Sequence, residues 1–132
     1  MTELNLITSE QVQAVGGQAR RFKSGLLYMI DLKSAGNTVD DQWLEKLHGQ
    51  SKLVELYLQG TAITDRAVEL LRTLTSLETL DLSETAITDK SLDTLGEMHH
   101  LTVLGLTGTN VSQEKVREIR ASMLNTRIIL ID

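Results

Sequence analysis

Hydrophobic residues return along this chain with a period of 24 residues. Segments that begin at Leu53, Leu77 and Leu101 each carry leucine at their first, fourth and sixth positions. Alternation of this kind is typical of a short strand with one buried face. The strand positions are Leu53, Leu56 and Leu58, then Leu77, Leu80 and Leu82, then Leu101, Leu104 and Leu106, with Leu27, Ile30 and Leu32 upstream and Ile128 and Leu130 downstream. The pattern therefore predicts five strands.

A short helix is predicted after each strand except the last. Thr64, Thr88 and Ser112 share one repeat position, and their side chains are of the kind that caps a helix N-terminus. Apolar residues then recur three apart, at Val68 and Leu71, Leu92 and Leu95, and Val116 and Ile119, with Val39, Leu44 and Leu47 in the first unit. Near the N-terminus Ile7, Val12 and Val15 repeat this pattern, and Thr8 and Gln11 match a capping box. The first predicted element is thus a helix without a preceding strand.

A single strand–helix unit cannot bury its own leucines, but stacked units cover one another. We therefore expect parallel strands joined by right-handed crossovers. Thr61, Thr85 and Thr109 share a position just after the strand. We expect them to be buried, with their hydroxyls bonded to the backbone of the neighbouring turn, because buried polar groups need partners.

Three of these units match a known pattern. "LVELYLQGTAI", "LETLDLSETAI" and "LTVLGLTGTNV" resemble the leucine-rich repeat L-x-x-L-x-L-x-x-N/C-x-L, with Thr in the Asn/Cys place. The unit length and helical second half resemble the ribonuclease-inhibitor and F-box-associated classes, and the resemblance covers residues 7–132.

The resemblance implies an α/β fold, a right-handed solenoid with five short parallel strands on the concave face and helices on the convex face. It implies one domain, 1–132, in which 1–26 form an N-terminal helical half-repeat cap, 27–124 the repeats and 125–132 a terminal strand. A solenoid of this kind usually binds proteins on the concave face.

Strand residues between the leucines point out of that concave face. They read Met29, Asp31 and Lys33; Glu55, Tyr57 and Gln59; Thr79, Asp81 and Ser83; Val103, Gly105 and Thr107; and Arg127, Ile129 and Ile131. Asp31, Glu55 and Asp81 surround Tyr57 on strands about 4.8 Å apart, and Gly105 is expected to leave bare backbone. This patch predicts binding of a protein or peptide, one of basic character. The alternative is a solvated sheet face on an acidic protein.

The last predicted strand has no successor, so its edge is expected to be open. Arg127 carries its only charge, while Ile129 and Ile131 are apolar, which favours association through this edge. Another register would turn both isoleucines inward and expose Ile128 and Leu130 instead. The alternative function is therefore a small structural or assembly subunit, or a homodimer joined edge to edge.

Composition and charge exclude further classes of function. The 132 residues suffice for one domain, and 41% hydrophobic with 23% charged residues is ordinary for a globular protein. The net charge of −5 disfavours nucleic acid, which needs a basic face. Cysteine is absent, and the sequence contains no signal peptide and no run of eighteen apolar residues. These features predict a cytoplasmic protein that neither spans nor binds a membrane.

The histidines and the other reactive side chains do not predict an enzyme, a metal site or a cofactor. His99 and His100 are adjacent and His48 is distant, whereas zinc needs three or four converging ligands. No nucleophile, base and orienting group can be assembled. Arg20, Arg21 and Lys23 surround Phe22 in what is expected to be a solvated connector, or a contact for an acidic partner. Trp43 aligns with Ala67, Ser91 and Lys115, on the outer side of the helices. It is expected to pack on the loop 33–38 or to mark a second contact site.

Overall fold

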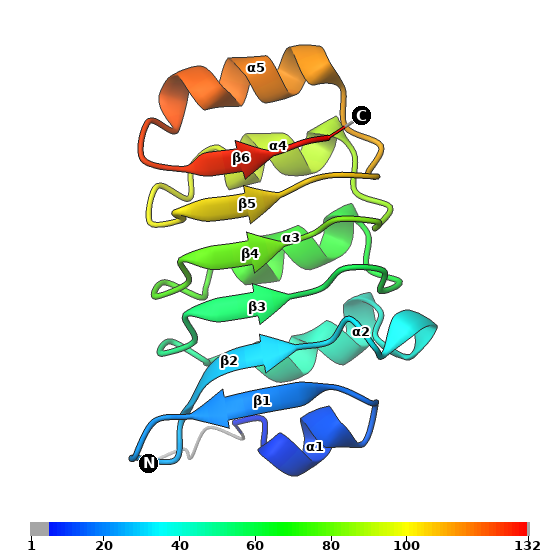
Figure 1. The fold of residues 1–132 in the computed structure, drawn as a ribbon, viewed down its shortest axis with the longest axis vertical. Helices are drawn as coiled ribbons and strands as arrows, with labels where there is room; N and C mark the ends of the chain where they lie inside the picture. Colours follow the sequence, from blue (N-terminus) through cyan, green and yellow to red (C-terminus); the bar gives the residue numbers. More distant parts are fainter. Residues whose placement is uncertain (1–5, 132) are drawn as a thin grey trace.

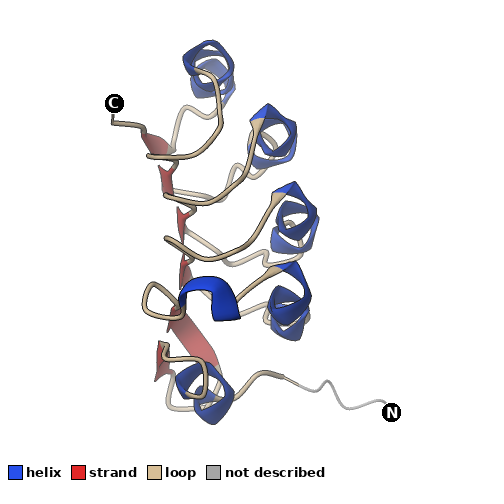
Figure 2. Cartoon of the chain, turned by 90° about the vertical axis from the view of Figure 1, so that its right-hand side faces the viewer, coloured by secondary structure: helices blue, strands red, loops and turns tan. Residues whose placement is uncertain are grey.

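The computed structural model describes residues 6–131, which form a single stack of strands and helices. The elements are α1 (Ser9–Gln13), β1 (Gln18–Arg21), β2 (Leu27–Asp31), a 3₁₀ turn (Gly36–Thr38), α2 (Asp41–Leu44), a second 3₁₀ turn (Glu45–Leu47), β3 (Glu55–Tyr57), α3 (Asp65–Leu71), β4 (Thr79–Asp81), α4 (Asp89–Leu95), β5 (Val103–Gly105), α5 (Gln113–Ser122) and β6 (Arg127–Ile129). The strands form one sheet in sequence order (Figure 1), and the helices all cover the same side of it (Figure 2).

The predicted repeat is confirmed in the register of the sheet. Strands β2 to β6 are parallel, and Ile30, Leu56, Leu80, Leu104 and Ile128 lie opposite one another across them. These residues are buried in one continuous hydrophobic core with the apolar residues of the helices. Each unit closes its core only against its neighbours, as a solenoid requires.

A strand at the N-terminal edge was missed. Strand β1 pairs antiparallel with β2, with Arg20 opposite Met29, so Arg20 and Arg21 lie in a strand and not in the expected connector, although both side chains are exposed as expected. Its sequence, Gln-Ala-Arg-Arg, does not alternate between apolar and polar residues. Such alternation arises when one face of a strand is buried, whereas β1 pairs with β2 along one edge and its side chains are mostly exposed. The hairpin closes where Phe22 N donates to Leu26 O at 2.8 Å, and Gly25 adopts φ +96° there. The N-terminal cap is therefore a helix and a strand.

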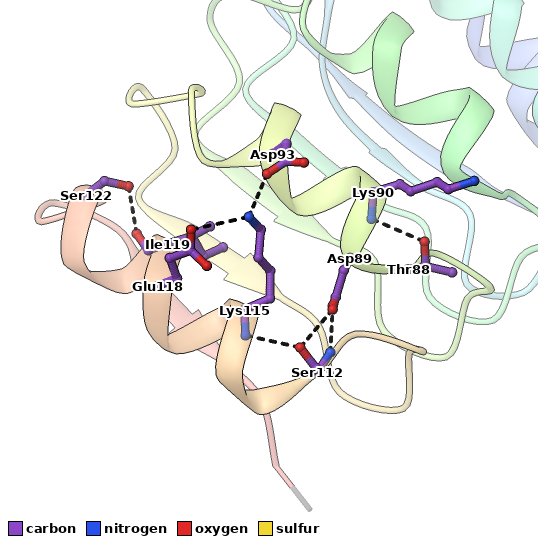
Figure 3. A network of polar contacts seen from close by, with 9 residues as sticks. All are labelled: Thr88, Asp89, Lys90, Asp93, Ser112, Lys115, Glu118, Ile119 and Ser122. Atoms are coloured by element: carbon purple, nitrogen blue, oxygen red, sulfur yellow. Dashed lines mark hydrogen bonds and ion pairs between the residues drawn. The ribbon is translucent and has the colours of Figure 1, made fainter.

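The predicted helix caps are confirmed, and each also bonds to the preceding helix. Thr64, Thr88 and Ser112 accept from backbone N–H groups of their own helices. In addition Ser112 N donates to Asp89 Oδ1 at 2.7 Å and its hydroxyl donates to Oδ2 at 2.8 Å (Figure 3). The same pair of bonds joins Thr64 to Asp41 and Thr88 to Asp65. We call this series the aspartate ladder; its signal in the sequence was the spacing of 24 residues between Asp41, Asp65 and Asp89.

The threonines after the strands bond within their own turn. Thr61, Thr85 and Thr109 donate to the carbonyls of Leu58, Leu82 and Leu106 at 2.8, 2.6 and 2.7 Å. The expected bond to a neighbouring turn is therefore wrong. The chain bends so tightly after each strand that the carbonyl three residues earlier is the nearest acceptor.

The repeat position that Trp43 shares with Ala67, Ser91 and Lys115 is not exposed to solvent in every unit. Ala67 and Ser91, one and two units later, are buried, so the expected outer position is wrong for them. This side of each helix meets the adjacent helix, which leaves room only for small side chains. Trp43 itself is partly buried against the core and lines an open groove of about 630 Å³ together with Ile7 and Thr38.

Candidate functional site

The candidate site is the strand face, meaning the side of the sheet that the helices leave uncovered. The register places Tyr57 directly between Asp31 and Asp81, and Glu55 between Met29 and Thr79. Because the strands are parallel and in register, one repeat position forms one row across the sheet. The expected alignment of these residues is thus correct.

Tyr57 is held by an acceptor on its own strand. Its hydroxyl donates to Glu55 Oε1 at 2.6 Å. This bond, burial and the nearby carboxylates of Glu55, Asp31 and Asp81 raise the pKa of Tyr57 to about 12. The phenol therefore keeps its proton to a higher pH than an ordinary tyrosine does, and the bond to Glu55 restrains its hydroxyl end on the strand face.

A cation already lies beside this ring. Lys33 Nζ is 5.9 Å from the centroid of the Tyr57 ring and 3.7 Å from Asp31 Oδ2. A cation within about 6 Å of an aromatic face is attracted by the ring quadrupole. The Lys33 side chain is half exposed, so its ion pair with Asp31 is worth little in water. The row Asp31–Tyr57 thus has the geometry to accept an ammonium or guanidinium group.

Gly105 is covered, and the expectation that it leaves bare backbone is wrong. A Cβ atom at this position would lie 2.6 Å from Asp81 Oδ1 and 3.2 Å from Ser83 Oγ. Asp81 Oδ1 also accepts a hydrogen bond from Ser83 N at 3.0 Å. The missing side chain of Gly105 therefore gives the Asp81 carboxylate room to lie across β5.

Two residues near the strand face, Gln18 and Glu84, were not recognised from the sequence, and the place of Arg20 in a strand was not expected. Strand β1 places Gln18 opposite Asp31 and Arg20 opposite Met29, so the sheet has a cation at its N-terminal edge. Glu84, just after β4, has φ +58°, a left-handed conformation. The signal for Glu84 was its repeat position, since glycine stands 24 residues before it and 24 residues after it.

The last strand has the register in which Ile128 is turned into the core. Ile128 lies opposite Leu104 and is 8% exposed, whereas Ile131 is 68% exposed. Arg120 of α5 donates to the carbonyl of Ile128 at 3.0 Å. This bond occupies one acceptor of the edge strand, a protection that the sequence pattern did not indicate.

The histidines and helices add no further chemistry on the strand face. His100 Nδ1 lies 2.9 Å from the carbonyl of Leu77, while His99 is exposed. Between residues 6 and 131, no group of three or more His, Cys, Asp or Glu side chains is placed to hold a metal ion. Within the same range no helix is long and apolar enough to cross a membrane.

Comparison with known proteins gives one family. Residues 51–111 match the family model for the leucine rich repeat. A search of curated proteins found no match. Among solved structures, an internalin (InlF) of Listeria monocytogenes is similar with a TM-score of 0.41 and 16% sequence identity. That similarity covers 77% of this chain and 40% of the internalin chain, and at this score it carries no argument.

Proposed function

The chain is a leucine-rich-repeat protein, and we propose that it is a protein-interaction module that binds a basic segment of a partner on its strand face. The general role as an interaction module is the one that leucine-rich repeats typically have. The basic partner and the face are inferences from the residues of the site.

The observation that carries the proposal is the row Asp31–Tyr57–Asp81, with Glu55 beside it. It combines an aromatic ring with three carboxylates on adjacent strands. Lys33 supplies an intramolecular example of the contact, since its ammonium group lies against both the ring and Asp31. A lysine or arginine of the partner would take the same kind of place between Tyr57 and Asp81. Aromatic residues ringed by charge are common centres of protein interfaces.

Gly105 has a supporting role in this proposal. It does not contact the partner through bare backbone, because Asp81 and Ser83 cover it. It keeps the Asp81 carboxylate flat on β5, where a basic side chain on Tyr57 can reach it. A side chain at position 105 would displace the carboxylate.

Charge reversal on the strand face tests this proposal. We expect Glu55→Lys with Asp81→Lys to fold normally and to lose binding to partners captured from a lysate and to a synthetic oligo-arginine peptide. The matched control is Glu45→Lys with Glu97→Lys, which makes the same change in net charge at exposed positions away from the strand face. Electrostatic contacts mainly affect the association rate and its salt dependence. Equal loss in both variants would show an effect of net charge alone and contradict the proposal.

A second proposal is self-association through β6. It is supported by the place of β6 at the edge of the sheet and by the exposed side chain of Ile131. Arg127 and Ile129 also belong to β6, and their side chains would lie beside those of the second copy's strand on the strand face. Arg120 opposes it, because its bond to Ile128 removes one acceptor that a second strand would need. The oligomeric state of the protein distinguishes the two proposals.

A further inference from the structure

A small hollow lies at the N-terminal end of the stack, away from the row Asp31–Tyr57–Asp81. It has a volume of about 270 Å³ and lies among the segment before and within α1, the turn between β1 and β2, and the loop before β3. Thr8 and Glu10, Arg21, Leu26 and Gln50 line it. None of the functions discussed above uses this hollow.

Gln50 is the unusual residue of this hollow. It stands 24 residues before Leu74 and 48 residues before Met98, and both of these are buried in the core. Gln50 is also buried, at 4% exposure, and its Nε2 atom has no hydrogen-bond partner among residues 6–131. Buried amide groups almost always have partners. A leucine would fill this position in the repeat without leaving an unpaired donor, so an amide here indicates a ligand with an acceptor.

The charges around Gln50 indicate the sign of that ligand. Arg21 lines the hollow, and Lys52 lines an adjoining hollow of about 120 Å³ that shares Leu26 and Gln50 with it. The ion pairs found between residues 6 and 131 include neither cation. Of the residues that the structure describes, Glu10 is the one carboxylate in either lining. The described linings thus hold two cations and one carboxylate, in a chain whose net charge is −5.

We propose that this hollow binds a carboxylate group, which accepts a hydrogen bond from Gln50 Nε2 and pairs with the Arg21 guanidinium. Both protein groups are donors, and guanidinium matches the two oxygens of a carboxylate. Because Nε2 is fully buried, the Gln50 amide turns toward the hollow when the carboxylate binds. Glu10 disfavours a doubly charged phosphate more than a singly charged carboxylate. The volume admits a small carboxylic acid or the side chain of an aspartate or glutamate from another chain.

This site is independent of the strand face, so either proposal can fail alone. The side-chain amide of Gln50 provides a direct probe, because its NMR signals in ¹⁵N-labelled protein can be assigned from their absence in Gln50→Leu. Sodium acetate and sodium propionate, both singly charged, are titrated against sodium chloride at equal ionic strength. A poly-glutamate peptide and sodium phosphate are titrated in the same way.

We expect saturable shifts of the Gln50 amide with the carboxylates and none with chloride. Binding should weaken at least tenfold in Gln50→Leu, read from neighbouring backbone amides, and in Arg21→Gln, read from the Gln50 amide itself. Lys90→Gln, on α4, is the control for loss of one positive charge and should bind as the wild type does. If Gln50→Leu fails to fold, the comparison of Arg21→Gln with the control Lys90→Gln still tests whether the carboxylate binds in this hollow.

The two sources of the carboxylate are separated by affinity. Tighter binding of the peptide than of either free acid identifies an acidic partner chain, and the reverse order identifies a small acid. Absence of a saturable shift with every carboxylate overturns the proposal. So does a response to phosphate alone, or equal binding by wild type, Gln50→Leu and Arg21→Gln.

Discussion

The Tyr57 hydroxyl donates to Glu55 Oε1 at 2.6 Å, which ties two side chains of the same strand into one hydrogen-bonded unit on the strand face. The bond keeps the phenol protonated, and with burial and the surrounding carboxylates it raises the pKa of Tyr57 to about 12. In the unfolded chain a tyrosine ionises near pH 10.

This shift predicts how stability depends on alkaline pH. Between pH 10 and 12 the unfolded tyrosine has lost its proton while the folded one retains it, so the contribution of Tyr57 to stability is complete below pH 10 and is lost as the pH rises through 12. We expect Tyr57→Phe to lose less stability than the wild type over this interval, as measured by urea unfolding. The difference in absorbance at 295 nm between the two proteins should titrate with a midpoint of about 12. A midpoint near 10 would contradict the hydrogen bond to Glu55.

The aspartate ladder predicts unequal effects of its members. Asp65 accepts from Thr88 N, from the Thr88 hydroxyl and from Ser91 Oγ. Asp89 accepts the equivalent two bonds from Ser112, but Lys115 stands at the repeat position of Ser91 and has no hydroxyl to donate. We expect Asp65→Ala to lower the free energy of unfolding by about 2–3 kcal/mol and Asp89→Ala by about 1 kcal/mol. Chemical denaturation at pH 7 measures both. Equal losses would contradict the added role of Ser91.

The lowered pKa of Asp65 predicts how the stability of the protein depends on acidic pH. Burial alone would raise the pKa of Asp65, but hydrogen bonds from Ser91 and Thr88 outweigh it and lower the pKa. The stabilisation from Asp65 is therefore complete above the ordinary pKa of about 4 and is lost as the pH falls through the lowered value. Wild type and Asp65→Ala should accordingly converge in stability as the pH falls below 4, when their unfolding curves are compared at successive pH values.

Glu84 predicts a stabilising substitution. Its φ of +58° is unfavourable for any residue with a Cβ atom, and the equivalent Gly60 has φ +74°. We expect Glu84→Gly to raise the free energy of unfolding by about 0.5–1 kcal/mol. Gly60→Ala should lower it by a similar amount, since no atom lies within 4 Å of its added Cβ and only backbone strain remains. A loss of stability in Glu84→Gly would show that the Glu84 side chain makes contacts that outweigh its strain.

The core predicts a large effect of a charge at Leu80. Leu80 is fully buried between Leu56 and Leu104. An aspartate there has no partner, so we expect Leu80→Asp to unfold the protein at 25 °C. Thr79→Asp, one residue earlier but on the strand face, should retain the native circular dichroism spectrum. A folded Leu80→Asp would contradict the repeat alignment.

The β6 edge predicts a change in oligomeric state. Arg120→Ala frees the Ile128 carbonyl, so if copies pair through this edge the variant should associate more strongly than the wild type. Ile129→Lys with Ile131→Lys should be monomeric. Light scattering over a range of concentrations measures both. Monomeric wild type and Arg120→Ala at high concentration would exclude pairing through β6.

The parallel part of this fold could be predicted from the sequence because its signal is repeated. Leu56, Leu80 and Leu104 each carry the same information, so every copy supports the others. Strand β1 occurs once, at an edge, and its pairing depends on a hairpin rather than on buried apolar residues. Its prediction from alternation therefore failed.

The strand face was predicted better in position than in detail. The row Asp31–Tyr57–Asp81 follows directly from the period. What covers Gly105, what Arg120 bonds to and why Gln50 is buried all depend on side-chain conformations that a period does not specify. Residues that depart from their repeat position, such as Glu84 and Gln50, were the available signal for these features.

The aspartate ladder also gives the stack a direction. Each helix from α2 to α4 offers an acceptor to the unit that follows, and each following unit returns a donor of the same kind, from Thr64, Thr88 or Ser112. The two bonds from each Thr or Ser to the preceding Asp are the same in every joint, so a copy of residues 65–88 inserted after residue 88 would make these bonds at both of its ends. The original Asp65 would lose only its added bond from Ser91, because the copied Ala67 would take the place of that serine. The protein is in this sense modular, and its length can be changed by whole units while the backbone and hydroxyl bonds of the ladder are kept.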